Sequence, residues 1–167
     1  MKQKPNAAKT IFAIYGLILI WIVLFKMAFS VDEIRFLQTT RNLNIIPFYY
    51  GTDAGRIQTR EVLLNLIVFI PMGLYLRMFE ITGCKAILYG FCCSLAFEFC
   101  QFLFAIGGSD ITDIITNTSG AVAGVCLYAF LRKIFSSKQQ ADRFINRTAS
   151  IALALFGALT FLLFWAN

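Results

Sequence analysis

The sequence predicts an all-α protein, a polytopic bundle of about five helices that cross a membrane. Hydrophobic residues make up 59% of its 167 residues and charged residues only 14%, and the mean hydropathy is +0.72. Soluble domains are typically about 45–50% apolar and about 25% charged, and a domain of ~150 residues buries only ~70% of the surface that its unfolded chain exposes. Lipid must cover the rest. This composition excludes a soluble enzyme, a disordered chain and a secreted disulfide scaffold.

Apolar runs near the length that crosses a bilayer, about 20 residues as a helix, recur along the chain. Runs of this length indicate helices, because the strands of a membrane barrel would be ~10 residues of alternating pattern. The five expected spans are residues 11–29, 62–78, 84–106, 111–131 and 148–166. Four helices with a re-entrant segment are the nearest alternative.

The segments around these spans have distinct compositions. Lys2, Lys4 and Lys9 precede the first span, whose apolar core is long for a signal peptide, so we interpret it as a retained signal anchor. The outer loop, residues 30–61, opens with an amphipathic stretch at 31–37. Its aromatic residues suit the headgroup layer. The segment 132–147 is basic and is interpreted as a cytoplasmic connector that touches anionic headgroups. The whole chain, 1–167, is predicted to be one transmembrane domain.

The distribution of Lys and Arg predicts a multi-pass cell-membrane protein with its N-terminus inside and its C-terminus outside. In this orientation ten of the 15 basic residues lie in cytoplasmic segments, as the positive-inside rule requires. The net charge of +6 is then explained by orientation in the membrane, so no nucleic-acid partner is expected.

The residue inventory restricts the chemistry. The chain has no His, which excludes Ser-His-Asp triads, Cys-His pairs and His-ligated zinc. None of the five Cys forms a C-x-x-C pair, and all lie in or beside apolar runs, so we expect them to pack as small apolar residues. No cofactor and no resident metal are expected.

Polar side chains inside the spans are the main functional signal, because an ionisable group costs at least ~2.5–3.5 kcal/mol at the centre of a span. Glu98 and Gln101 are three residues apart and therefore share one face of the third span. Asp110, Asp113 and Asn117 form a stripe at the start of the fourth. A tight turn joins the two spans, so these residues are expected to converge at their outer end.

Further residues extend this convergence. Asn65 lies near the outer end of the second span, and three arginines of the outer loop suit recognition of phosphate or carboxylate. The predicted outward-facing binding pocket comprises Asn65, Glu98, Gln101, Asp110, Asp113, Asn117, Arg41, Arg56 and Arg60. Pro71, Gly73, Gly120 and Gly124 are predicted to act in helix packing.

Simpler interpretations exist for several of these residues. Asp110 or Asp113 would suit the first turn of the fourth helix as a cap. Asn65 and Gln101 would suit hydrogen bonds between helices. Glu98 is harder to explain in this way, because its apolar neighbours leave it in need of a donor, a cation or a proton.

The order and spacing of these motifs resemble the VanZ-like family of bacterial membrane proteins over about residues 40–130. The motifs are Asn44-Ile45-Ile46-Pro47-Phe48, Asn65-x-x-x-Phe69-x-Pro71-x-Gly73, Ser94-Leu95-x-x-Glu98-x-x-Gln101 and Asp110-x-x-Asp113-x-x-x-Asn117-x-x-Gly120-x-x-x-Gly124. The chain departs from the family pattern at one point. The family usually has an Arg just before the first Asp of the fourth helix, and this chain has Gly107-Gly108-Ser109 there instead. Any role of that Arg beside the carboxylates must pass to Arg41, Arg56 or Arg60, or be lost.

The resemblance implies a role in the cell envelope. The family's named member is associated with low-level resistance to teicoplanin-type glycopeptide antibiotics, and the resemblance implies no established enzymatic activity. The leading hypothesis is therefore a pocket that binds a lipid-linked cell-wall precursor or a glycopeptide headgroup.

Two alternatives remain beside this hypothesis. The first is an enzyme acting on an envelope lipid, with Glu98 and Asp113 as base and acid, or with Asp110 as ligands of Mg²⁺ or Mn²⁺; the absence of His and of an activated nucleophile disfavours it. The second is a structural subunit of a larger envelope complex.

Overall fold

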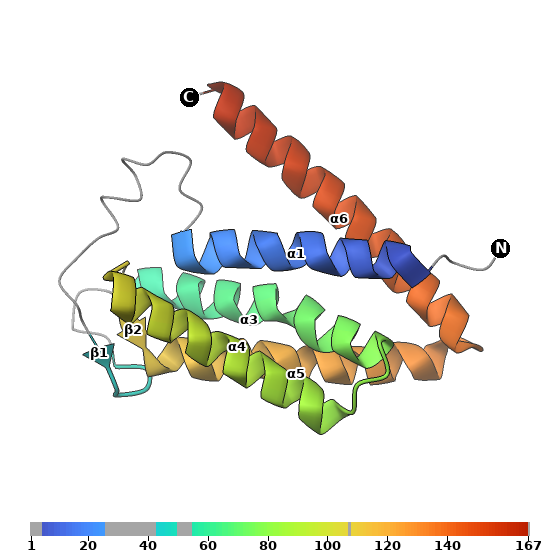
Figure 1. Ribbon diagram of the computed structural model, residues 1–167, viewed down its shortest axis with the longest axis horizontal. Coiled ribbons are helices and arrows are strands. Elements are labelled where there is room, and N and C mark those ends of the chain that lie inside the picture. Colours follow the sequence, from blue (N-terminus) through green and yellow to red (C-terminus); the bar gives the residue numbers. More distant parts are fainter. Residues whose placement is uncertain (1–4, 26–42, 50–54, 107, 167) are drawn as a thin grey trace. The chain divides into compact units, whose positions relative to one another are not determined.

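The computed structural model of the protein describes residues 5–25, 43–49, 55–106 and 108–166, with only the backbone at residues 5, 6, 55–58 and 166. The amphipathic stretch predicted at 31–37, most of the outer loop and Arg41 lie outside the described residues. The described part contains five helices and one pair of short strands (Figure 1). These elements are α1 (Pro5–Phe25), β1 (Leu43–Asn44), α3 (Gly55–Met78), α4 (Gly83–Phe104), β2 (Ser109–Asp110), α5 (Ile111–Ile134) and α6 (Lys138–Ala166).

All five helices of the described part are long and apolar enough to cross a membrane. The candidate spans are Ala7–Phe25, Thr59–Met78, Gly83–Phe104, Ile111–Ile134 and Lys138–Trp165. The predicted all-α class is confirmed, as are five helices of a length and composition that suit a membrane span. A helix suits this environment because all of its backbone hydrogen bonds are made within the segment.

The ends of several helices differ from the sequence-based expectation. α1 begins at Pro5, six residues before the predicted start of its span. α6 begins at Lys138, so the segment 132–147, predicted as a connector, is helical except at 135–137. The physical reason is that a helix does not have to stop where its apolar residues stop. Polar turns in the headgroup layer satisfy their backbone groups by continuing the helix, and hydropathy gives no signal for them.

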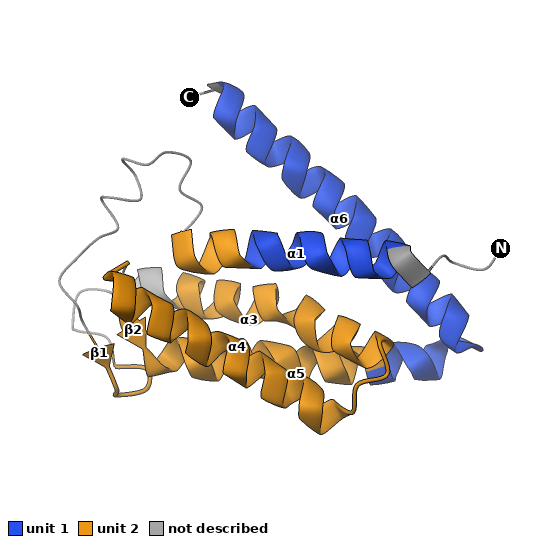
Figure 2. Ribbon diagram, viewed as in Figure 1, with its two compact units in different colours: residues 1–19, 129–167 blue, residues 20–128 orange. Residues whose placement is uncertain are grey.

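The chain divides into two compact units, residues 20–128 and residues 1–19 with 129–167, which are described separately (Figure 2). The larger unit contains α3, α4, most of α5 and the two strands. The smaller unit contains α6, the last residues of α5 and most of α1.

Glycines bring α3 and α5 into backbone contact within the larger unit. A Cβ atom added at Gly120 would meet the carbonyl oxygen of Leu66, and one added at Gly124 would meet the carbonyl oxygen of Ile70. On the facing helix, a Cβ at Gly73 would meet the carbonyl oxygen of Ala121. Residue numbers rise together in the first two contacts, so α3 and α5 run parallel.

α4 runs antiparallel to α5, as the tight connection between them requires. Asn117 of α5 donates to Ser94 of α4 at 2.9 Å, and Gly90, one turn earlier in α4, faces Ala121, one turn later in α5. Between α3 and α4, the rings of Phe69 and Phe97 pack edge to face with centroids 6.3 Å apart. The three helices therefore form a closely packed bundle in which the start of α3, the end of α4 and the start of α5 lie at the same end.

The two strands lie at this end of the bundle. β1 pairs in parallel with β2, with Leu43 opposite Ser109 and Asn44 opposite Asp110. β2 directly precedes α5. The pairing therefore attaches part of the loop predicted at 30–61 to the start of a helix about 66 residues later in the chain.

Candidate functional site

Polar side chains gather where α4 ends and α5 begins, and we refer to this region as the junction. α4 ends through Ala105, whose left-handed conformation (φ 55°, ψ 36°) reverses the chain. The N–H of Ile106 donates to the carbonyl oxygen of Gln101 at 3.0 Å, which satisfies one of the last carbonyls of the helix. The chain then returns through β2 into α5.

Glu98 is the buried acidic residue of the junction, with 5% of its surface exposed. Its Oε2 accepts a hydrogen bond from the backbone N–H of Asp110 at 2.8 Å. Its backbone carbonyl accepts one from the Ser109 hydroxyl, also at 2.8 Å. The sequence indicated that Glu98 needs a donor, and the backbone N–H just before α5 is one. The positive end of the helix dipole at this point also favours a carboxylate.

Asp110 connects three parts of the junction. Its Oδ1 accepts the N–H of Thr112 at 2.7 Å, which is the hydrogen bond of a helix N-cap. Its Oδ2 accepts a hydrogen bond from the side-chain amide of Asn44 at 3.0 Å. Asp110 therefore acts as the cap that the simpler interpretation describes, and it also fixes a distant segment of the chain to the helix start.

That segment, residues 43–49, is called the strap here. Asn44 holds it in a turn, because its Oδ1 accepts from the N–H of Ile46 at 3.1 Å and its Nδ2 donates to the carbonyl of Tyr49 at 3.3 Å. Phe48 has a positive φ of 55°, and its N–H donates to the hydroxyl of Thr112 at 3.0 Å. Five large side chains of the strap are more than half exposed: Leu43, Ile45, Ile46, Phe48 and Tyr49.

Two buried amides lie near the carboxylates along the bundle. Asn117 is fully buried and donates to Ser94, and its Oδ1 has no hydrogen-bond partner within the described ranges. Gln101 is 3% exposed and donates to the carbonyl of Val23, near the end of α1, at 3.1 Å. Its Oε1 likewise lacks a partner in the described part of the chain. Both amides link helices, and each keeps one buried acceptor for a further donor.

The other predicted residues lie at varied depth and exposure. Two contacts fix the register of α4 against α5: Ser94 with Asn117, and Gly90 with Ala121. In this register Glu98 lies level with Asp113, which is half-buried. Asn65 is half-buried in α3, and Arg60 is exposed near the start of that helix. Arg56 belongs to the first turn of α3, where only the backbone is described, and Arg41 lies outside the described residues.

Sequence reasoning did not select several residues that build the junction: Asn44, Ser94, Ser109 and Thr112. Ser109-Asp110-x-Thr112 has the composition of a helix start, a local signal that was available. Asn44 and Ser94 were visible only as parts of family motifs. Among the described residues, no three His, Cys, Asp or Glu side chains group as a metal site would require.

Five candidate spans and a polar junction at one end of a helix bundle define an α-helical multi-pass membrane protein. The chain matches VanZ/LLP1 over residues 12–132, and it belongs to this family. It is 39% identical to Protein VanZ of Enterococcus faecium over 150 residues, which cover 89% of each chain. The family resemblance predicted from the motifs is therefore confirmed. No solved structure matches the chain.

Proposed function

We propose that this protein acts in the bacterial cell envelope, where it lowers sensitivity to teicoplanin-type glycopeptide antibiotics. In this proposal the junction faces outward and binds the headgroup of a lipid-linked cell-wall precursor or of a glycopeptide. Membership of the VanZ/LLP1 family, with 39% identity to Protein VanZ over most of both chains, supports the envelope role.

The observation that carries the binding proposal is the hydrogen-bonded series from Glu98 through Asp110 to Asn44. It fixes the buried carboxyl group of Glu98 and the half-buried one of Asp110 beside a strap whose apolar side chains are exposed. A ligand with a polar headgroup and a lipid-facing part needs such a pair of surfaces. The exposed side chains suit the boundary of headgroups and acyl chains, and carboxylates accept hydrogen bonds from the hydroxyl and amide groups of a headgroup.

The buried amide oxygens of Gln101 and Asn117 add to this argument. A buried acceptor without a partner costs about 1–3 kcal/mol, and both oxygens lie in the same bundle as the carboxylates. A headgroup donor or an ordered water would recover that cost. Exposed Arg60 supplies a guanidinium suited to a phosphate near the same end of the bundle.

The outward orientation rests on the distribution of charge. The connection between α5 and α6 is strongly basic, which favours the cytoplasmic side for that end of α5. The junction lies at the opposite end of α5 and therefore faces outward in this proposal.

Antibiotic susceptibility of cells that carry Glu98→Gln or Asp113→Asn tests the proposal. A glutamine at position 98 keeps an oxygen that accepts the Asp110 N–H, so it removes the charge while leaving the hydrogen-bond geometry in place. At wild-type protein levels, each variant should lose most of the protection against teicoplanin-type antibiotics. Asp142→Asn, in the partly buried ion pair with Lys138 of α6, is the matched control and should retain it. Full protection by both junction variants would contradict the proposal.

An enzymatic function has less support. The described part of the chain offers no three-residue group for Mg²⁺ or Mn²⁺, and Asp110 and Glu98 already accept hydrogen bonds that organise the junction. A purely structural role accounts for the helix packing but not for the buried amide oxygens of Gln101 and Asn117, which have no partner among the described residues.

A further inference from the structure

The connection between α5 and α6 is the other concentration of charge in the described chain, and we refer to residues 129–147 as the elbow. It comprises the last turns of α5, the connection at 135–137 and the first turns of α6. Its basic residues are Arg132, Lys133, Lys138, Arg143 and Arg147, and its single acidic residue is Asp142. The charge is therefore far from balanced within the elbow.

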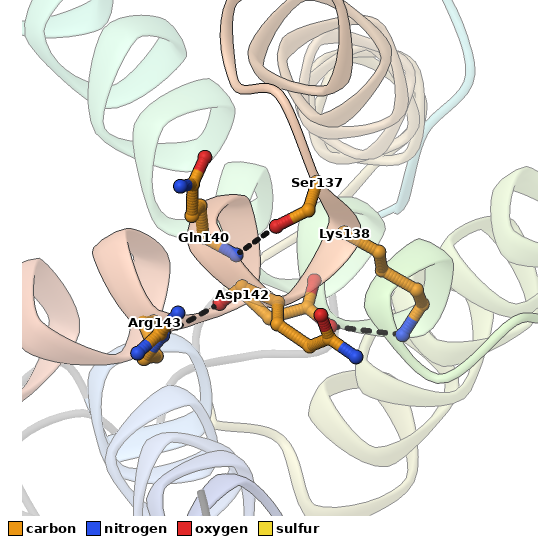
Figure 3. A network of polar contacts seen from close by, with 6 residues as sticks. Ser137, Lys138, Gln140, Asp142 and Arg143 are labelled. Atoms are coloured by element: carbon orange, nitrogen blue, oxygen red, sulfur yellow. Dashed lines mark hydrogen bonds and ion pairs between the residues drawn. The ribbon is translucent and has the colours of Figure 1, made fainter. Parts of the chain in front are cut away.

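Among the described residues, the three guanidinium groups of the elbow make no ion pair with a carboxylate. Figure 3 shows the surroundings of one of them, Arg143, and the pairing of Lys138 with Asp142. Lys138 pairs with Asp142 at 2.8 Å, which uses the only carboxylate. Arg143 donates through Nε to the carbonyl of Gln139 at 3.1 Å, so it makes a backbone contact and no ion pair. Arg147 lies four residues later, on the same face of α6, and both arginines are exposed.

Arg132 is the residue that points to a ligand. Its Nη1 is buried and has no hydrogen-bond acceptor among the residues that the structure describes. A buried donor without an acceptor is unfavourable, and the free-energy cost is larger when the donor belongs to a charged group than when it belongs to a neutral one. A guanidinium cannot lose its proton in a protein. An anionic acceptor is therefore the chemistry that this nitrogen requires.

The length of α6 places the elbow in the headgroup layer. At about 1.5 Å per residue, its 29 residues span about 43 Å, whereas the hydrocarbon core is about 30 Å thick. The apolar residues that follow Arg147 are enough to cross this core. Residues 138–147 therefore extend past it, to the depth at which lipid phosphates lie.

We propose that the elbow is a binding site for the phosphate of an anionic phospholipid. Arg132 donates to the phosphate oxygens, and Arg143 and Arg147 supply the positive charge that favours an anionic over a zwitterionic headgroup. This site is separate from the junction and does not depend on its proposed function.

Lipid retention by the purified full-length protein, measured by native mass spectrometry, tests the proposal. The probes are phosphatidylglycerol and phosphatidylcholine with the same acyl chains. The wild type should retain phosphatidylglycerol about tenfold better than phosphatidylcholine. Arg132→Gln should lose about tenfold in that retention, which corresponds to about 1.4 kcal/mol for the lost hydrogen bond to the phosphate. The exposed pair of changes Arg143→Gln and Arg147→Gln should reduce the preference without affecting the fold.

Lys85→Gln, an exposed position in the first turn of α4, removes the same charge outside the elbow and should leave retention unchanged. Equal retention of the two lipids by the wild type would overturn the proposal, as would equal losses in Lys85→Gln and the elbow variants. Millimolar inorganic phosphate should not displace the lipid; complete displacement would show that the site binds free phosphate and would overturn the assignment to lipid. If Arg132→Gln does not fold, the change of both Arg143 and Arg147 decides the question alone.

Discussion

At the scale of single residues, Asp110 acts as the helix cap that its simpler interpretation predicts, and it has a second contact that the sequence did not indicate. One carboxylate oxygen caps α5 through Thr112, and the other holds the strap through Asn44. The backbone N–H of the same residue donates to Glu98. A capping residue is thus part of the junction, because the groups that start α5 are also those that fix the ends of its neighbours.

Asp110→Ala should destabilise the protein by about 2 kcal/mol, since it removes a helix cap worth about 1 kcal/mol and a further hydrogen bond of about the same value. Asp110→Asn keeps one acceptor oxygen, which can still cap α5 through the Thr112 N–H. Its N–H₂ group cannot accept the hydrogen bond from Asn44, so this variant should be destabilised by about half as much as Asp110→Ala, about 1 kcal/mol. The free energy of unfolding in mixed detergent micelles measures the effect. The control Glu61→Ala, at an exposed position in α3, should cost no more than about 0.5 kcal/mol. An Asp110→Ala variant as stable as the wild type would contradict the capping geometry.

The helical period predicted which of these residues share a face, and it did so correctly for Glu98 with Gln101, both of which are buried in α4. It could not predict the bond between Asn44 and Asp110. These residues are 66 positions apart, and their contact depends on how the loop returns to the bundle. Contacts that follow from the period of a single helix could therefore be predicted from the sequence, whereas contacts that depend on the path of a loop could not.

At the scale of elements, the contact of α3 with α5 depends on glycines. Backbone atoms of the facing helix occupy the space that a side chain would need at these positions. The atoms that a Cβ would meet at Gly73, Gly120 and Gly124 include carbonyl oxygens of the facing helix. Backbone atoms in a helix cannot move aside as the end of a flexible side chain can. The parallel pair therefore permits no larger residue at these positions without separation of the helices.

Gly120→Ala should destabilise the protein by about 1–3 kcal/mol, the range for overpacking in a well-packed core. Gly157→Ala in α6 is the matched control, because nothing lies within 4 Å of the added Cβ. That control should be neutral, or more stable by up to about 1 kcal/mol through the higher helix propensity of Ala. The two variants are compared by thermal unfolding in the same detergent. Equal melting temperatures would show that α3 and α5 are not in backbone contact at Gly120.

Helix existence was predictable at this scale, whereas helix ends were not. Each span has the ~20 apolar residues that the hydrocarbon core requires, so composition alone located all five helices. The start of α6 at Lys138 has no such signal, since its first turns are charged and lie beyond the apolar run. Pairing of β1 with β2 also escaped prediction, because two-residue strands carry no periodicity.

At the scale of the whole molecule, the orientation in the membrane decides what the junction can bind. The directions of α3, α4 and α5 alternate as in a chain that crosses the bilayer at each helix. The elbow and the junction lie at opposite ends of α5. If the basic elbow is cytoplasmic, as the positive-inside rule favours, the junction faces outward and the C-terminus that follows α6 is outside as well.

Alkaline phosphatase fused after Asn167 should therefore be active, because this enzyme matures only outside the cytoplasm. A fluorescent protein fused after Ser136, in a chain truncated at the elbow, should report from the cytoplasm. The second fusion is a check on the first. Only α6 lies between the two fusion sites, so if α6 crosses the membrane the two reporters must lie on opposite sides of it. A cytoplasmic reporter after Asn167, together with an external one at the elbow, would reverse the orientation. The junction would then face the cytosol, where it could not meet an antibiotic that acts outside, even though the family and the helix packing would be unchanged.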